Sequence, residues 1–385
     1  MSATRAFWLA GLGSVAAVLL SGVPAAADVT SELKELHDTF CAPQHVATVK
    51  EAEAAQAKLK QWALSPDRLT EAKRAILLET EAHVALAVGD VVTAAEKLAA
   101  LQPLAPEAAE TWELAVLVSA AQGDAEAQEG ALRKLAGLVS DEQRKIVSQR
   151  RRWVRKVGGP APDVKIVAED GTRVDVRERN GIVLVVDLWN MYDTTEAYAE
   201  ALRALRDEMK SVLCVQFVGV NADGERRKAE AEAFAEKAGY TWPQCYEEKA
   251  SRPPITHEAF GAGAPPWTVL VDGVGKVRAV GAVTDPAFLY AVRAVAREAQ
   301  EKFAAGAKGG GGATAAAGGG GATEPRVGKG DLPSNDEAEA LLRQARTYLR
   351  TGLKTKAKEL LEKILREYPG TRQAREAEER LEGWH

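Results

Sequence analysis

The chain has 385 residues, of which 46% are hydrophobic and 27% are charged. This length exceeds what one compact core usually holds, and this composition excludes an intrinsically disordered chain. Lys and Arg total 50 against 55 Asp and Glu, and the resulting net charge of −5 argues against a dedicated nucleic-acid binder. Two or three folded units are therefore expected.

The first 27 residues have the three parts of a secretory signal peptide. Arg5 precedes an apolar stretch over residues 6–20, and small residues follow up to Ala27. The apolar stretch is short for a membrane-spanning helix, so cleavage near Ala27 is favoured over retention as an anchor. We therefore expect an exported chain, periplasmic or extracellular, with no transmembrane segment in its mature part.

Residues 28–156 are predicted to form a helical domain, because apolar residues recur there at three-and-four spacing. Gly89-Asp90 and Gly123-Asp124 lie 34 residues apart, which is the period of a tetratricopeptide helix pair. In that register, small and large apolar residues fall where the repeat needs them for close helix packing. They are Ala82, Ala85, Ala94, Leu98, Leu101 and Pro106, followed less regularly by Trp112, Leu132 and Leu135, with Gln128 at a small-residue position.

A basic cluster, Arg150-Arg151-Arg152 with Arg155 and Lys156, ends this helical domain. We interpret it as a solvated helix end, with an acidic partner surface or lipid head groups as the alternative.

Residues 157–303 alternate between strand and helix patterns. The predicted strands are 164–167, 182–189 and 213–220, the predicted helices are 195–209, 228–238 and 286–299, and a hairpin joins 267–272 to 277–280. This alternation predicts an α/β domain with a mostly parallel sheet covered on both faces. The hairpin is expected to add antiparallel strands at the edge.

Residues 304–333 are rich in Gly and Ala, with two runs of four glycines, and predict a flexible linker. The last segment, 334–385, again fits the tetratricopeptide pattern, through Ala345, Tyr348, Gly352, Ala357, Leu361, Ile364 and Pro369. One repeat is marginal alone, so we expect it to dock onto the N-terminal helical domain, another subunit or a foreign partner. Such repeats present grooves to proteins and peptides, which are the expected partners. A homo-oligomer is left open.

The three cysteines, Cys41, Cys214 and Cys245, are far apart in the sequence, and the five histidines are equally scattered. No C-x-x-C pair or metal-binding spacing occurs, so neither a disulfide framework nor a metal or other cofactor is predicted. Cys41 lies four residues before His45 in a helix-breaking stretch, an arrangement that we interpret as structural.

Three segments of the central domain resemble the TlpA-like and AhpC/TSA-type redoxins, which have the thioredoxin-like fold. Pro160 to Asp163, with Asp170-Gly171, is similar to their entry hairpin. The segment Val186 to Tyr192, with Asp187, Trp189 and Tyr192, resembles the strand that leads into their C-x-x-C pair. Pro266 to Asp272 resembles their cis-proline strand, with Pro266 at the proline position. The resemblance implies a thioredoxin-like domain between two tetratricopeptide-like modules.

The resemblance also implies that Asp193 and Glu196 stand at the two cysteine positions of the family. A carboxylate cannot form a mixed disulfide, so no catalytic residue is predicted there. Asp193-Thr194-Thr195-Glu196 is similar instead to a helix capping box, with Asp193 as the cap.

Two further positions bear on substrate binding and on the lost thiol pair. Pro265 lacks the backbone N–H with which the family holds an extended substrate. Asp187 stands where thioredoxins have a buried carboxylate that serves the resolving cysteine. Without that cysteine, it is left as a relic with a raised pKa or as the partner of a cation.

Two functions follow from these observations. The first is an exported, non-catalytic scaffold for protein-protein interaction. The second is a thiol-disulfide oxidoreductase or peroxidase that works through Cys245 or Cys214. Cys214 lies in an apolar strand, which indicates a core residue, and Cys245 follows a predicted short strand. The site rather than the fold decides between them, and the loss of both cysteines favours the scaffold.

Overall fold

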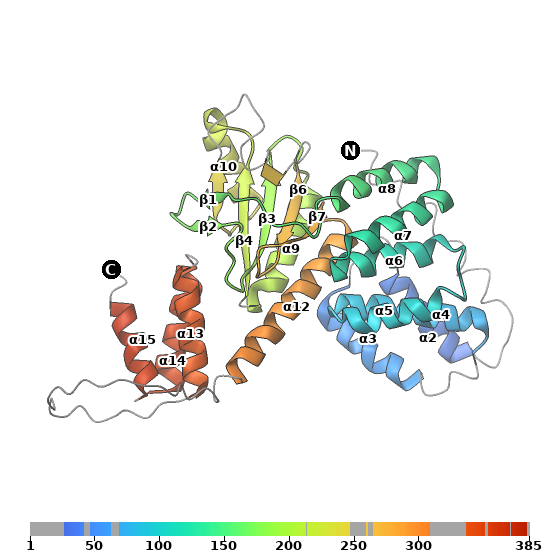
Figure 1. Ribbon diagram of the computed structural model, residues 1–385, viewed down its shortest axis with the longest axis horizontal. Coiled ribbons are helices and arrows are strands. Elements are labelled where there is room, and N and C mark those ends of the chain that lie inside the picture. The colour runs from blue at the N-terminus through green and yellow to red at the C-terminus, as the bar shows by residue number, and fades with distance from the viewer. Residues whose placement is uncertain are drawn as a thin grey trace, which may run out of the picture.

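The computed structural model describes residues 27–41, 47–62, 69–212, 214–246, 259–260, 265–308, 336–350, 353–369 and 371–382 (Figure 1). The predicted signal peptide, except Ala27, lies outside the described residues, as do His45, Gly352 and residues 309–333 of the predicted linker. Figure 1 shows helices at the N-terminal side, a central sheet with its own helices, and a separate group of C-terminal helices.

The N-terminal part consists of helices that follow one another along the chain. Their bounds are α2 (Ala27–Phe40), α3 (Val49–Trp62), α4 (Glu71–Ala87), α5 (Val91–Leu101), α6 (Ala109–Gln122), α7 (Ala125–Leu138) and α8 (Asp141–Val154). Pro106 is exposed and Trp112 is half-buried. The other apolar positions assigned to the tetratricopeptide register are buried between the helices, as that register predicts. They are Ala82, Ala85, Ala94, Leu98, Leu101, Leu132 and Leu135.

The two helix hairpins, α4–α5 and α6–α7, each turn at a Gly-Asp pair. Gly89 and Gly123 have φ values of +73° and +69°, in the left-handed region that glycine adopts without strain. The carboxylates of Asp90 and Asp124 then accept backbone N–H groups three residues later, at 3.2 and 2.9 Å. The pair thus ends one helix and caps the next, which explains its repetition 34 residues apart.

The central sheet has the order β5-β4-β3-β6-β7. Its strands are β3 (Val183–Trp189), β4 (Val215–Asn221), β5 (Gln244–Tyr246), β6 (Trp267–Val271) and β7 (Val277–Gly281). The pairs β3–β4 and β4–β5 are parallel, whereas β3–β6 and β6–β7 are antiparallel. The hairpin β6–β7 therefore adds antiparallel strands at one edge of the sheet, as predicted, with β6 beside β3 and β7 outermost. Because two of the four strand pairs are antiparallel, the sheet is mixed and not mostly parallel.

The two faces of the sheet are covered differently. One face packs on α9 (Glu196–Glu208), α10 (Lys228–Lys237) and α12 (Pro286–Lys308). The other face is covered by a small hairpin, β1 (Lys165–Val167) with β2 (Arg173–Asp175), and by Phe260. Short 3-10 turns at Met209–Ser211 and Glu225–Arg227 lie in the connections.

Helix α12 joins the sheet to the N-terminal helices because it is buried on two sides. Phe288, Val292 and Val295 face the sheet, whereas Ala287, Tyr290 and Ala294 lie in the core of the N-terminal helices. The turn at Gly89 abuts α12 so closely that an added Cβ would lie 2.9 Å from the Arg293 carbonyl oxygen. The helix also runs on to Lys308, past the predicted end of the domain at residue 303.

The basic cluster at the end of α8 is solvated in part, as predicted: Arg152, Arg155 and Lys156 are exposed. Arg150 differs from this prediction, because it is buried. Its guanidinium donates to both carboxylate oxygens of Asp285 at 2.8 and 2.9 Å and to Glu113 at 2.7 Å. Arg150 therefore ties two N-terminal helices, α6 and α8, to the segment that precedes α12.

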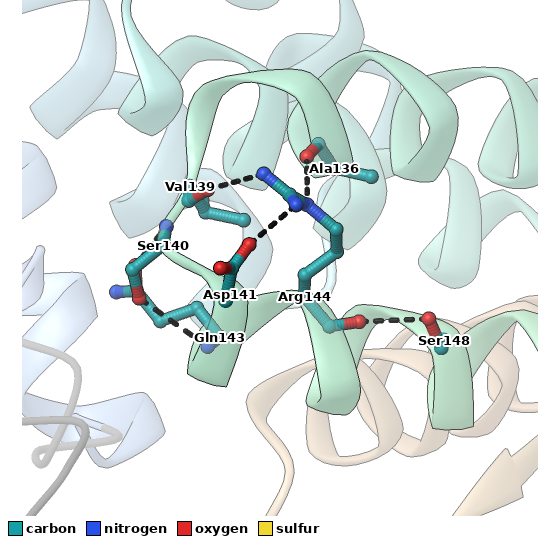
Figure 2. Close-up of polar contacts among 7 residues, drawn as sticks. All are labelled: Ala136, Val139, Ser140, Asp141, Gln143, Arg144 and Ser148. Atoms are coloured by element: carbon teal, nitrogen blue, oxygen red, sulfur yellow. Dashed lines mark hydrogen bonds and ion pairs between the residues drawn. The ribbon is translucent and has the colours of Figure 1, made fainter.

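Arg144, near the start of α8, is exposed, unlike Arg150. Figure 2 shows Arg144, which is exposed, donating to the Ala136 carbonyl oxygen at 2.9 Å and pairing with Asp141. Next to it, Ser140 and Gln143 form a capping box that starts α8.

The C-terminal part contains α13 (Asp336–Arg350), α14 (Lys354–Glu367) and α15 (Arg372–Glu382). Its predicted packing residues are fully buried: Ala345, Tyr348, Ala357, Leu361 and Ile364. Ile182, which precedes β3, lies in the same apolar core. The Lys356 amine donates to the Val215 carbonyl oxygen at 2.8 Å, and burial lowers the pKa of this lysine to about 8. The repeat thus docks on the central domain. One of the predicted alternatives, docking on the N-terminal helices, is therefore wrong.

Candidate functional site

The loop between β3 and α9 occupies the place of the redox pair implied by the resemblance. The Asn190 side chain closes this loop: its amide donates to Asp193 at 2.9 Å, and its oxygen accepts the Asp193 backbone N–H at 2.7 Å. The cap of α9 is Thr195, whose hydroxyl accepts the Tyr198 backbone N–H at 3.2 Å. The prediction of Asp193 as the cap is therefore wrong. Asp193 lies two residues before the cap, and its carboxylate accepts a hydrogen bond from Asn190.

A second loop, which follows β4, holds the first one in place. Asp223 accepts the Met191 backbone N–H at 2.9 Å and the Asn221 side-chain amide at 2.7 Å. The Arg227 guanidinium lies 5.0 Å from the centre of the Tyr192 ring, which is exposed. These contacts bring the carboxyl ends of two parallel strands together, and they present Tyr192, Asp193 and Glu196 to solvent.

A buried carboxylate, Asp187, lies beneath this loop on the helix-covered face of the sheet. The Tyr198 hydroxyl donates to Asp187 Oδ1 at 2.8 Å, while Oδ2 has no hydrogen-bond partner among the described residues. Burial raises the pKa of Asp187 to about 7, against the lowering effect of the Tyr198 hydrogen bond. The two alternatives for Asp187 were a relic with a raised pKa and the partner of a cation. The structure supports the first, because the residue that hydrogen-bonds to Asp187 is a tyrosine.

The Asp187 carboxylate should make stability fall with pH. Its pKa in the folded state exceeds the ordinary value of about 3.9. The free energy of unfolding that Asp187 contributes is therefore fully present below about pH 4 and is lost as the pH rises through about 7. We expect Asp187→Asn, which still accepts from Tyr198, to be more stable than the wild type at pH 8 by roughly 2–4 kcal/mol. Urea unfolding at pH 5 and pH 8 measures this, and the advantage should shrink at pH 5. An equal effect at both pH values would contradict it.

Trp189 is fully buried beside the loop in a cluster of aromatic side chains. Its ring centre lies 5.5 Å from those of Phe234 and Tyr240, and its indole N–H donates to the Gln244 side-chain oxygen at 3.1 Å. The cluster fills the space between β3, α10 and β5, so Trp189 positions the loop and is not itself exposed to a ligand.

The two candidate thiols lie outside the loop itself. Cys214 is buried between β4 and α12, and burial raises its pKa to about 11, so its thiol stays protonated at neutral pH. Cys245 lies in β5 opposite Val220 and packs on the hairpin-covered face of the sheet, whereas Asp187 faces the helices. No disulfide joins any of the three cysteines, all of which belong to the described residues.

The cis-proline position is where the resemblance places it. The peptide bond between Pro265 and Pro266 is cis, and β6 begins at the next residue and pairs with β3. A pocket of about 260 Å³ lies at the opposite end of the sheet, away from the β3–α9 loop. It is lined by Asn180, Gly181, Val183, Asp272, Gly273, Val274 and residues of α12.

Sequence reasoning missed the residues that hold the loop in place. Asn221 and Asp223 follow a buried strand directly, and polar residues at the carboxyl end of a parallel strand are a signal that could have identified them. Tyr198 could have been found from its place one turn into the helix that follows Asp187. Thr195 was visible as a cap residue three positions before Tyr198.

Comparison with known proteins fits this architecture. Residues 339–371 match the tetratricopeptide repeat family, and the match spans most of α13 and all of α14. No curated protein is significantly similar to the chain in sequence.

Several solved structures are similar to a part of the chain. One is the thioredoxin domain of a thiol-disulfide oxidoreductase from Bacteroides vulgatus, with 21% identity, 32% of this chain and 86% of that chain covered, and a TM-score of 0.28. A thiol:disulfide interchange protein from a Bacteroides species has 24% identity, with 40% and 93% covered and a TM-score of 0.29. A secreted disulfide oxidoreductase from Mycobacterium tuberculosis has 14% identity, with 34% and 96% covered and a TM-score of 0.27.

These similarities are low, and the fold assignment rests on the strand order and pairing of the chain itself. The central part has the thioredoxin-like fold and lies between two sets of helices, and the match to the tetratricopeptide repeat family lies in the C-terminal set. None of the helices in the described part of the chain has the length and apolarity needed to cross a bilayer.

Proposed function

We propose that the chain is an exported, non-catalytic scaffold that binds other proteins through its helical repeats and its thioredoxin-like domain. The observation that carries this proposal is the β3–α9 loop. Both redox positions hold carboxylates, Asp193 and Glu196, on a loop that is otherwise held in place by Asn190 and Asp223. Without a thiolate, the loop has no nucleophile for disulfide exchange or for peroxide.

The proposal predicts an inactive wild-type protein. Purified chain should reduce insulin disulfides and remove peroxide no faster than a variant in which Cys41, Cys214 and Cys245 are all replaced by Ala. Loss of an activity in Cys245→Ala or Cys214→Ala alone would instead support the alternative, an oxidoreductase or peroxidase working through that cysteine. The outcome that contradicts the scaffold is therefore any turnover that depends on a native thiol.

The binding role is assigned to the C-terminal repeat, because repeats of this family present grooves to proteins and peptides. Affinity capture from the cell envelope, with the full mature chain and with a chain lacking residues 334–385, tests this role. Partners that are lost with the deletion support it. The mass of the recovered protein also tests export, since cleavage near Ala27 removes the first 27 residues.

A further inference from the structure

The end of α2 and helix α4 bring together three side chains that can bind a metal ion, with a fourth candidate nearby on α4. His37 and Cys41 are four residues apart at the end of α2, and Glu79 and His83 are four residues apart on α4. Residues at this spacing lie on the same face of a helix, so each helix offers two potential ligands to the other. The ligand atoms of His37, Cys41 and Glu79 all lie within 4.8 Å of one another.

The distances within this cluster suit a tetrahedral ion. Bond lengths of 2.0–2.3 Å to zinc place neighbouring ligand atoms about 3.3–3.7 Å apart. His37 Nε2 lies 3.4 Å from Glu79 Oε2, which falls within that spacing. One nitrogen, one sulfur and one carboxylate oxygen form a mixed set that suits zinc and its neighbours in the transition series, and not calcium or magnesium.

His83 lies one turn beyond Glu79 on α4, outside the three residues whose ligand atoms lie within 4.8 Å of one another, and is the candidate for the fourth position. It is more than nine-tenths buried, and its Nδ1 has no hydrogen-bond partner among the described residues.

The charges of the cluster also suit a divalent ion. A coordinated thiol loses its proton to solvent. The thiolate and the Glu79 carboxylate would then balance the two positive charges of the ion.

We propose that His37, Cys41, Glu79 and His83 form a structural site for a zinc-class divalent ion that fastens α2 to α4. His37 would bind through Nε2, since its Nδ1 lies 3.7 Å from Asp38 Oδ1, and a carboxylate beside the second ring nitrogen is the usual support of a metal-binding histidine. His37 and Glu79 both keep about 15% of their side chains exposed, which gives an ion a way in from solvent.

Cobalt titration of the full mature chain, freed of metal by a chelator, tests the site. We expect one Co²⁺ per chain, the strong visible bands of a tetrahedral site, and a near-ultraviolet charge-transfer band from a cobalt-thiolate bond. Stoichiometric Zn²⁺ should abolish both. Cys41→Ser should remove the charge-transfer band, whereas the matched variants Cys214→Ser and Cys245→Ser should keep it. His83→Ala should weaken Co²⁺ binding at least tenfold.

Circular dichroism of each variant separates loss of the site from loss of the fold. If Cys41→Ser does not fold, Glu79→Gln provides a second test, because it should lower the Co²⁺ affinity while every cysteine is retained. The proposal is overturned if the wild type takes up no Co²⁺, or if the charge-transfer band persists in Cys41→Ser or disappears in Cys245→Ser. An unchanged affinity in His83→Ala would remove His83 from the ligand set.

Discussion

A chain with Asp193→Cys and Glu196→Cys, in a background without the three native cysteines, is expected to gain a redox-active disulfide. The two positions flank Thr195, the cap of α9, so both thiols would lie at the positive end of the helix dipole. That position lowers a thiol pKa below about 8.5, and each unit of lowering raises the thiolate fraction about tenfold at a pH below the pKa. We expect insulin reduction at least roughly tenfold above the wild-type background.

The matched control places two cysteines with the same spacing at the opposite end of a helix. Ala233→Cys with Glu236→Cys uses two exposed positions near the end of α10, where the dipole disfavours a thiolate. Redox titration against glutathione and the pH dependence of thiolate absorbance measure both pairs. If the pair at positions 193 and 196 behaves like the control, with two ordinary and independent thiols, the alignment of this loop with the redox motif is wrong.

Much of the architecture could be predicted from local patterns. The Gly-Asp turns and small residues of the repeat gave the correct register, because each depends on neighbouring backbone geometry and close helix packing. Strands β3 and β4 were visible as apolar runs, and cis Pro266 was at the position that the resemblance implies. The pairing of β6 with β3 was not predicted, because it joins segments about 80 residues apart that no local pattern connects.

The parts of the candidate sites that could not be predicted depend on contacts between distant segments. His37 and Glu79 are 42 residues apart, and no motif scan along one helix connects them. Asp223 reaches Met191 only because β3 and β4 are parallel neighbours. Asp193 was assigned as a cap from its spacing to Glu196, yet Asn190, three residues earlier, competes for its carboxylate. In each case the sequence contains the residue types, and the fold chooses the partners.

The largest expected loss of stability comes from Arg150. Its side chain is about 5% exposed and pairs with Glu113 and Asp285, which hold α6, α8 and the start of α12 together. Arg150→Met keeps much of the volume but leaves two partly buried carboxylates without a cation. Removal of one partner from a buried ion pair costs about 3–5 kcal/mol. We expect a loss of that size in the free energy of unfolding, measured as a lower urea midpoint.

Arg144 provides the matched control on the same helix. Its pair with Asp141 is exposed, so Arg144→Met should lower the free energy of unfolding by no more than about 1 kcal/mol.

A triple variant, with Arg150→Met, Glu113→Gln and Asp285→Asn, separates the effect of charge from the effect of packing. It should recover most of the loss, because no unpaired charge is then buried. If the triple variant is as unstable as Arg150→Met, the guanidinium acts through its packing at this interface and not through its charge. If Arg150→Met is no worse than Arg144→Met, the ion pairs of Arg150 do not hold the helical domain to α12.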